Sequence, residues 1–306
     1  MIGLFISDAL PPEDALMKRA IDFLSKHRVK VFMPSVEAGA LSAKQKAETF
    51  NACIRNKEVD LVMSYWGGLK TIELIDYIDW ELLVTNPKPI VGYSDTTVLL
   101  QAVNTKGITS VLHGPALISF SKPLYREEML DYLRNAIDIS RYELPTHLSS
   151  NLQSDLTKEP VIDHTPVQVV CEGRGKGLAL AGNLQTLLLL NGTKFAAKLE
   201  GKILFIEEAE EVNINWFRRF LSQLRMTDGF NQLHGLVISK FTEVSQIPDD
   251  ALHEVLVEYG FDRCAFPVLT HFSSGHTDPI ITIPQDRIIS VIASKKKVVL
   301  TVGEKT

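Results

Sequence analysis

The first half of the chain alternates short apolar runs with longer segments of helical periodicity. Apolar runs of strand length lie at 2–7, 29–34, 59–68, 89–94 and 109–115. The helical segment after the second run begins with Ser42 and Gln45, which have the spacing of a capping box. Apolar runs separated by amphipathic segments predict βα units. We therefore expect an α/β fold with a parallel, doubly wound sheet, covered by helices on both faces.

Several glycine and polar positions fall where the predicted strands end. Gly67 and Gly68 end the third strand, Ser94 ends the fourth, and His113 lies near the end of the fifth. Ligands of open parallel sheets bind beyond the carboxyl ends of the strands. This edge is therefore the predicted location of a functional site.

The pattern changes between about 139 and 165. This segment is polar, contains Pro145 and Pro160, and shows no period. We interpret residues 139–165 as a linker with room for one edge strand. It separates an N-terminal α/β domain, residues 1–138, from a C-terminal domain, residues 166–306.

The second half resumes the alternation of strands and helices. An apolar strand leads into four glutamates at 201–211, and the runs 287–294 and 297–302 predict a closing antiparallel pair. The C-terminal domain is therefore expected to be a smaller, mixed β/α unit.

Composition and charge exclude several classes of protein. Of the 306 residues, 45% are hydrophobic and 23% are charged, as in ordinary globular proteins. The formal net charge is −5, and the only cationic block that stands out is at 295–297. Because binding to phosphate backbones needs clustered cations, we expect no nucleic-acid partner.

Cofactor, metal and membrane signals are also missing from the sequence. The three cysteines are far apart and odd in number, so they indicate neither a disulfide framework nor a metal site. The N-terminal apolar run lacks the basic region of a signal peptide, and no run of about 18 apolar residues occurs. We expect a cytoplasmic protein that needs no metal or cofactor and does not bind a membrane.

Ser94 is the first candidate for chemistry. The segment "GYSDT" at 92–96 resembles a nucleophile elbow, with Thr96 in place of its last glycine. Such a turn presents the hydroxyl, while the backbone N–H of Asp95 faces a developing oxyanion. The alternative is that Ser94 only caps the following helix, since serine is a favoured N-cap.

A serine nucleophile needs a base and an acid that orients the base. His276 lies in the short polar loop "SSGHTDP", where a side chain can reach a cleft, while His113 lies near the serine strand. Glu207 and Glu208 end an apolar strand. A charge at the end of a buried strand is costly without a partner, so we expect Glu207 to point inward and to have one.

The order Ser94, Glu207, His276, with its flanking residues, resembles the LD-carboxypeptidase family of serine peptidases. Within that family the chain is most similar to the microcin C self-immunity branch. The likeness rests on blocks that span nearly the whole chain: "GG" at 67–68, "NPKPIVGYSDTTVL" at 86–99, "HGP" at 113–115, "LAGNLQTLLLLNGT" at 180–193, "GKILFIEEAEE" at 201–211 and "GH" at 275–276.

The resemblance implies a role for each matching position. Ser94 would be the nucleophile, His276 the general base and Glu207 the acid that orients it. The N–H of Asp95 and the pair Gly67 and Gly68 would form the oxyanion hole. The fold would join a flavodoxin- or glutaminase-like N-terminal domain to a smaller β/α domain, and the chain would form a homodimer.

The residues that select the substrate are less clearly indicated. The family usually has tyrosine and a small residue where Leu69 and Lys70 stand here. The other substrate-binding candidates are His113, Asn183 and Trp66, of which the last could stack on a nucleobase, as could Trp80 or Trp216.

Three functions remain open from the sequence. The first is a serine carboxypeptidase-type hydrolase that cleaves the C-terminal aspartyl–nucleotide bond of microcin C-like compounds. The second is an LD-carboxypeptidase that trims murein tetrapeptides. The third belongs to another class: a catalytically inactive protein that binds a peptide or peptidyl-nucleotide on the same scaffold.

Overall fold

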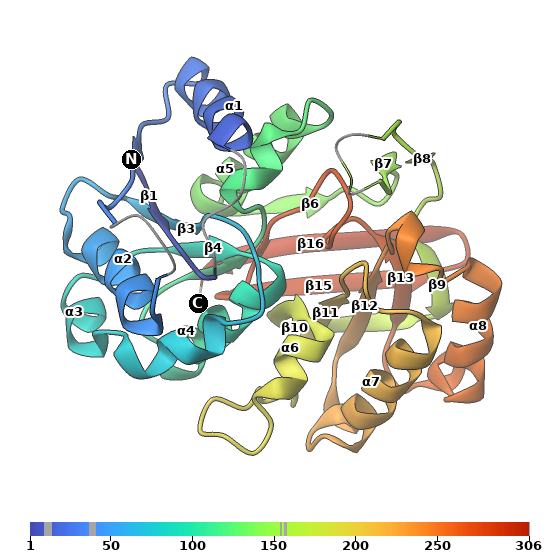
Figure 1. Ribbon diagram of the computed structural model, residues 1–306. Helices are drawn as coiled ribbons and strands as arrows, with labels where there is room; N and C mark the ends of the chain where they lie inside the picture. Colours follow the sequence, from blue (N-terminus) through green and yellow to red (C-terminus); the bar gives the residue numbers. More distant parts are fainter. Residues whose placement is uncertain (9–13, 37–40, 154, 156–157, 306) are drawn as a thin grey trace.

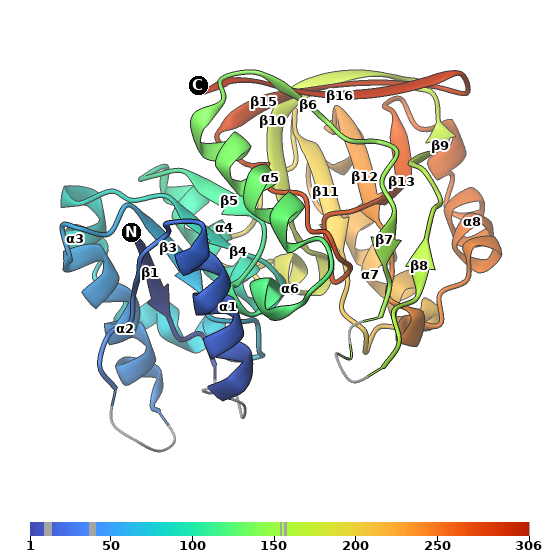
Figure 2. The ribbon, with the colours of Figure 1, turned by 90° about the horizontal axis from the view of Figure 1, so that it is seen from above.

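The computed structural model describes residues 1–8, 14–36, 41–153, 155 and 158–305. Two separate sheets form two lobes that lie side by side (Figures 1 and 2). In the described part of the chain, no helix is both long enough and apolar enough to cross a membrane.

The first sheet has the strand order β14-β5-β4-β3-β1-β2, and all of its strands except β14 are parallel. Its elements in the first half of the chain are β1 (Ile2–Phe5), α1 (Asp14–Lys26), β2 (Val31–Phe32), α2 (Ala43–Arg55), β3 (Leu61–Ser64), η1 (Thr71–Tyr77), α3 (Trp80–Thr85), β4 (Ile90–Gly92), η2 (Ser94–Thr96), α4 (Thr97–Lys106), β5 (Val111–His113), η3 (Leu117–Ser121) and α5 (Arg126–Asp138). The predicted capping box of Ser42 and Gln45 opens α2.

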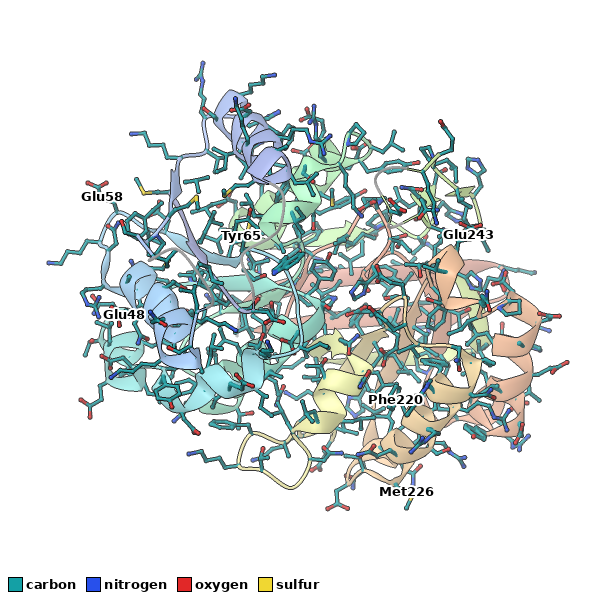
Figure 3. The ribbon with its side chains drawn as sticks, in the orientation of Figure 1. Glu48, Glu58, Tyr65, Phe220, Met226 and Glu243 are labelled. Atoms are coloured by element: carbon teal, nitrogen blue, oxygen red, sulfur yellow. The ribbon has the colours of Figure 1, made fainter. Side chains whose placement is uncertain are left out.

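Helices cover both faces of this sheet. One buried cluster packs α1 and α5 against residues such as Leu4 and Met63, and another packs α2 and α4 against Phe5 and Val62. Alternate strand residues therefore face opposite helical layers, which confirms the predicted doubly wound arrangement. Figure 3 shows how side chains fill these layers, with the fully buried Tyr65 labelled among them.

The second sheet is mixed and has the order β6-β16-β15-β10-β11-β12-β13-β9. Its strands β10 to β13 are parallel, and the remaining pairs are antiparallel. The elements are β6 (Tyr142–Leu144), β9 (Gln168–Cys171), β10 (Gly173–Asn183), α6 (Leu184–Leu189), β11 (Ile203–Glu207), α7 (Ile214–Met226), η4 (Phe230–Gln232), β12 (Gly235–Ser239), η5 (Glu243–Ser245), α8 (Asp249–Glu258), η6 (Phe261–Arg263), β13 (Val268–Phe272), β15 (Arg287–Ser294) and β16 (Lys297–Lys305).

Residues 173–183, which begin with three glycines at alternate positions, form the strand β10, which the sequence pattern did not predict. A Cβ atom on Gly175 would lie 1.7 Å from the carbonyl oxygen of His234, and one on Gly177 would lie 2.0 Å from that of Gly201. Neighbouring backbone comes so close at these positions that only glycine fits. The strand therefore lacks the alternation of apolar and polar side chains by which a strand is normally recognised.

Two segments connect the lobes, and of their strands only an edge strand in the linker was expected from the sequence. Strand β14 (Ile283–Pro284), late in the chain, pairs with β5 and so belongs to the first sheet. The predicted linker contains β6, an edge strand of the second sheet, and the short pair β7 (Ser150–Asn151) and β8 (Ile162–Asp163). The domain boundaries stay a prediction, but β14, from the predicted C-terminal domain, belongs to the sheet of the first lobe.

One predicted helix differs in type and length. Between the third and fourth predicted strands, where one helical segment was expected, the chain forms the 3-10 helix η1, followed by the short helix α3 with Asp79 as its N-cap. The side chain of Asp79 accepts a hydrogen bond from the backbone N–H of Leu82. Aspartate favours such capping positions over helix interiors, which explains the break.

Candidate active site

Ser94 lies at the tip of the turn that follows β4. Its φ angle is +58°, a left-handed conformation that non-glycine residues rarely adopt. No side-chain capping bond is present at the start of η2 or α4, and the Ser94 Oγ instead lies 3.1 Å from the Nε2 of His276. The capping interpretation of Ser94 is therefore wrong, and the geometry is that of a strained, presented hydroxyl.

The glycine loop, residues 67–71, packs directly against this serine. A Cβ on Gly67 would lie 2.9 Å from both the Cβ and the Oγ of Ser94. Gly68 has a φ of +131°, and a Cβ there would lie 2.3 Å from the Cβ of Asp8. Both positions therefore require glycine, one for close approach and one also for its backbone angle.

Two carboxylates hold the glycine loop. Asp8 accepts a hydrogen bond from the backbone N–H of Leu69 at 3.0 Å. Asp95 accepts bonds from the N–H and the hydroxyl of Thr71, at 2.8 and 2.6 Å. Burial raises the pKa of Asp95, although these bonds from Thr71 counteract part of that shift. Asp95, the residue after Ser94, thus joins the serine turn to the glycine loop.

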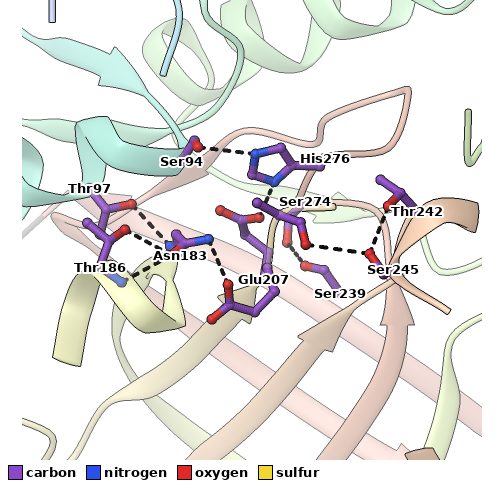
Figure 4. A network of polar contacts seen from close by, with 12 residues as sticks. Ser94, Thr97, Asn183, Thr186, Glu207, Ser239, Thr242, Ser245, Ser274 and His276 are labelled. Carbon is purple, nitrogen blue, oxygen red and sulfur yellow. Dashed lines mark hydrogen bonds and ion pairs between the residues drawn. The ribbon is translucent and has the colours of Figure 1, made fainter. Parts of the chain in front are cut away.

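His276 lies between Ser94 and Glu207, which come from different lobes (Figure 4). Its Nδ1 is 2.6 Å from the Oε2 of Glu207, so a ring protonated at Nδ1 donates to the carboxylate and leaves Nε2 free to accept from the serine hydroxyl. The ring also makes an edge contact with Tyr93, with 5.0 Å between ring centroids.

Burial and pairing act in opposite directions on the pKa values of this pair. Burial alone would lower the pKa of His276, but the charge of Glu207 and the hydrogen bond to it raise that pKa to about 9. Burial alone would raise the pKa of Glu207, but the charge and hydrogen bond of His276 hold it below the usual range. The prediction that Glu207 points inward is confirmed, since it is 1% exposed.

Glu208 is buried as well, which the sequence analysis did not predict. It accepts hydrogen bonds from the backbone N–H of Gln185 at 2.8 Å and from the Asn183 side chain at 3.2 Å. Burial, and then the nearby charge of Glu207, raises the pKa of Glu208 to about 8. Successive residues of a strand point to opposite sides of the sheet. Glu208 can be buried beside Glu207 because it follows the last residue of β11 and turns toward the start of α6.

The other predicted site residues differ in their exposure and in the contacts they make. Leu69 is 85% exposed beside the site, and the Lys70 ammonium lies 3.7 Å from Asp8. Asn183 is the N-cap of α6 and uses its side chain to bond Thr186 and Glu208. Trp66 is half-buried against the core beside α1, and its carbonyl accepts a bond from Ser7. A substrate contact for any of these four stays a prediction.

His113 is not placed to act on Ser94. Its ring is 1% exposed, and its Nε2 lies 2.5 Å from the carbonyl oxygen of Ser274. Burial lowers the pKa of His113, which keeps the ring neutral and able to donate to that carbonyl. The structure thus places His113 behind the loop of His276, and not on the surface as expected of a substrate contact.

The site can support nucleophilic chemistry at a carbonyl. A presented hydroxyl, an imidazole within hydrogen-bond reach and a buried carboxylate on the far ring nitrogen are the groups that acyl transfer needs. Within the described residues, no group of histidine, cysteine or acidic side chains is suited to hold a metal ion.

Comparison with known proteins identifies the class as a peptidase. The sequence pattern of the LD-carboxypeptidase N-terminal domain matches residues 4–114, and that of the C-terminal domain matches residues 176–291. YocD of Bacillus subtilis is 30% identical over 81% of this chain and 77% of its own. The chain belongs to the LD-carboxypeptidase family.

Relatives named as a microcin self-immunity protein and as a murein carboxypeptidase both match the chain over long stretches. The microcin C7 self-immunity protein MccF of Escherichia coli is 27% identical over 98% of this chain and 92% of its own. The murein tetrapeptide carboxypeptidase of Pseudomonas aeruginosa is 25% identical over 77% of this chain and 73% of its own. Both branches of the predicted family are thus represented among the relatives.

Solved structures confirm the fold. An MccF-like protein from Bacillus anthracis superimposes with a TM-score of 0.91, at 25% identity, over 99% of this chain and 96% of its own. MccF in complex with aspartyl sulfamoyl adenosine gives a TM-score of 0.86, also at 25% identity and with the same coverage. The arrangement of two joined lobes is therefore common to this chain and to the MccF proteins.

Proposed function

We propose that the chain is a serine hydrolase with Ser94 as nucleophile, His276 as general base and Glu207 as the acid that orients the base. The observation that carries the proposal is the continuous series of contacts from the Ser94 hydroxyl through the His276 ring to the buried Glu207 carboxylate. Each member is held on a different element, so this alignment is a product of the whole fold.

In the proposed reaction, the Ser94 oxygen attacks the substrate carbonyl while His276 takes its proton. The negative oxygen of the tetrahedral intermediate would accept hydrogen bonds from the N–H groups of Asp95 and the glycine pair. The imidazolium, stabilised by Glu207, returns the proton to the leaving group, and an acyl-enzyme remains. Water, activated by the same histidine, then releases the acid and restores Ser94.

The proposed substrate is a peptidyl-nucleotide that carries a C-terminal aspartyl group, as in microcin C-like compounds. The support is the likeness to MccF over nearly the whole chain and the existence of an MccF complex with aspartyl sulfamoyl adenosine. Trimming of murein tetrapeptides is the second candidate, favoured by the relative of that name. The cytoplasmic location and the homodimer predicted from the sequence belong to the same proposal.

The deciding experiment measures hydrolysis of two compounds by mass spectrometry. Purified wild-type protein is incubated with aspartyl sulfamoyl adenosine or with a murein tetrapeptide, beside Ser94→Ala and the control Ser25→Ala. Ser25 lies exposed on α1, far along the chain from the turn at Ser94, so its loss should leave turnover unchanged.

Release of sulfamoyl adenosine by wild type and control, with at least a 10⁴-fold loss in Ser94→Ala, is the expected result. Release of the terminal residue of the tetrapeptide instead would transfer the proposal to murein. Tight binding of either compound without turnover would favour the third candidate, an inactive binding protein.

A further inference from the structure

The loop that carries His276 is fixed on both sides of the histidine. Before it, the Ser273 hydroxyl lies 2.7 Å from that of Ser150, and the Ser274 carbonyl accepts the bond from His113. After it, Asp278 exchanges two backbone hydrogen bonds with Asn151, of 2.7 and 3.0 Å. The polar segment between the lobes therefore touches this loop at both ends.

A buried ion pair adds a third attachment. The Lys122 ammonium donates to both carboxylate oxygens of Asp278, at 3.1 and 2.8 Å. The Asp278 side chain is 2% exposed and that of Lys122 is 15% exposed. Lys122 follows η3 on the first lobe, whereas Asp278 lies two residues after His276, so the pair ties the base to the lobe that holds Ser94.

The ion pair of Lys122 and Asp278 lies close to His276 along the chain. Only Thr277, itself fully buried, separates Asp278 from His276. Among the salt bridges of the described residues, Lys122 is the only partner of Asp278. A buried carboxylate that loses its cation is strongly disfavoured. Without Lys122, the Asp278 side chain gains by turning toward water, and the backbone beside His276 would turn with it.

We propose that Lys122 and Asp278 are positioning residues that hold the His276 ring in line with Ser94 across the two lobes. This inference rests on the proposed function, because it assigns the ion pair a role in the same reaction. Neither side chain contacts the reacting atoms. Their effect is on the alignment of the base, so it should appear in the chemical step more than in substrate binding.

The test is Lys122→Met, which keeps the length of the side chain and removes its charge, compared with Lys122→Arg. The control is Lys88→Met. Lys88 is also buried, and its ammonium donates to the Cys53 carbonyl. Lys88 lies just before the amino end of β4, whereas Ser94 follows the carboxyl end of that strand. We expect Lys122→Met to lower kcat about 10- to 100-fold with KM changed less than about twofold, since a displacement near 1 Å costs that much.

Lys122→Arg should restore most of the activity, and Lys88→Met should lower stability without lowering kcat. In the double variant Lys122→Met with Asp278→Asn, no uncompensated charge remains, so kcat should be higher than in Lys122→Met alone. An unchanged kcat in a folded Lys122→Met protein would overturn the inference, as would a loss of equal size in Lys88→Met.

A measurement without substrate separates this inference from the proposed function. The proton between His276 and Glu207 should give a low-field NMR signal in wild type that is weakened or shifted in Lys122→Met and kept in Lys88→Met. If wild type cleaves neither compound, the proposed function fails while this signal still reports the position of His276. If the signal and kcat are both unaffected by Lys122→Met, the positioning role is wrong.

Discussion

The turn of Ser94 and the loop of His276 are held in place by different means. The serine turn is fixed by the backbone: a φ of +58°, a strand directly before it and a glycine loop in contact with it. The histidine loop is fixed by polar contacts with residues far away in the sequence: the side chains of Ser150, His113 and Lys122 and the backbone of Asn151. The turn of the proposed nucleophile thus depends mainly on backbone geometry, and the loop of the proposed base depends on contacts with distant parts of the chain.

This difference decides which changes should harm each side. The serine turn should be sensitive to added volume, because its neighbours are backbone atoms at close range. The histidine loop should be sensitive to lost charges and hydrogen bonds, since such contacts hold it on both sides of His276. The predictions below test the two sides in order of expected effect.

The largest effect is expected on the side of the base, from Glu207→Gln. The amide cannot stabilise an imidazolium or fix the tautomer, so kcat should fall about 10³- to 10⁴-fold. The pKa of His276 should also fall, because Glu207 is what raises it against burial. Rate measurements from pH 5 to 10 should show the rising limb of kcat/KM at lower pH than in wild type.

The exposed Glu211 offers a matched control for that variant. Glu211→Gln should keep both the rate and the pH profile of wild type. A Glu207→Gln protein that kept more than about a tenth of the activity would remove Glu207 from the mechanism.

On the side of the nucleophile, Gly67→Ala should lower kcat about 10²- to 10³-fold. The added methyl group would stand 2.9 Å from the Ser94 hydroxyl, so the serine or the glycine loop must move and the oxyanion donors move with it. Gly107→Ala is the control: its φ is +62° but no atom lies within 4 Å of the added Cβ. That variant should lose some stability and no activity. Equal kinetics for the two variants would contradict the close-contact account.

The wild-type protein should show a strong pH dependence. As the proposed base, His276 must be neutral to accept a proton, and Glu207 raises its pKa to about 9, so kcat/KM should rise between pH 7 and 9. Stability should change in the opposite direction. A histidine with a raised pKa stabilises the fold fully below its unfolded pKa of 6.5, and that contribution disappears as the pH rises to about 9. Activity profiles and thermal unfolding at pH 6 and 9 measure both trends.

The smallest effect is expected from Glu208→Gln. A carboxyl whose pKa is raised from 4.5 to about 8 favours the folded state when protonated, so it destabilises the fold increasingly as the pH rises through that range. The amide cannot ionise, so the variant should melt about 2–4 °C higher than wild type at pH 9 and show no gain at pH 5. Differential scanning calorimetry at the two pH values tests this, and an equal change at both would contradict the pKa shift.

The same contrast explains what the sequence could predict. The βα alternation of the first lobe, the capping box at Ser42 and the turn at Ser94 are local patterns, and the structure contains all three. The pairing of Glu207 with His276 followed from family resemblance, since no pattern in the sequence relates positions 69 residues apart. Glu208, Lys122 and Asp278 were missed because their significance depends on burial, which a single sequence does not reveal.

Two strands were missed for related reasons. In β10, glycines take the place of side chains because neighbouring carbonyl groups come too close. In β14, two residues are too few to give any period, and the partner His113 is 170 residues earlier in the chain. Both are long-range effects of the kind that places His276.

Strand β14 also has a consequence for biosynthesis. While the chain is being made, β5 leaves the ribosome about 170 residues before the strand that covers its edge. Until Ile283 arrives, β5 presents unpaired backbone groups at the edge of a sheet, which is a hazard for pairing with other chains. The sheet of the first lobe therefore stays incomplete until almost the whole chain has been made. A fragment that ends before β14 should be more prone to aggregation than the full chain.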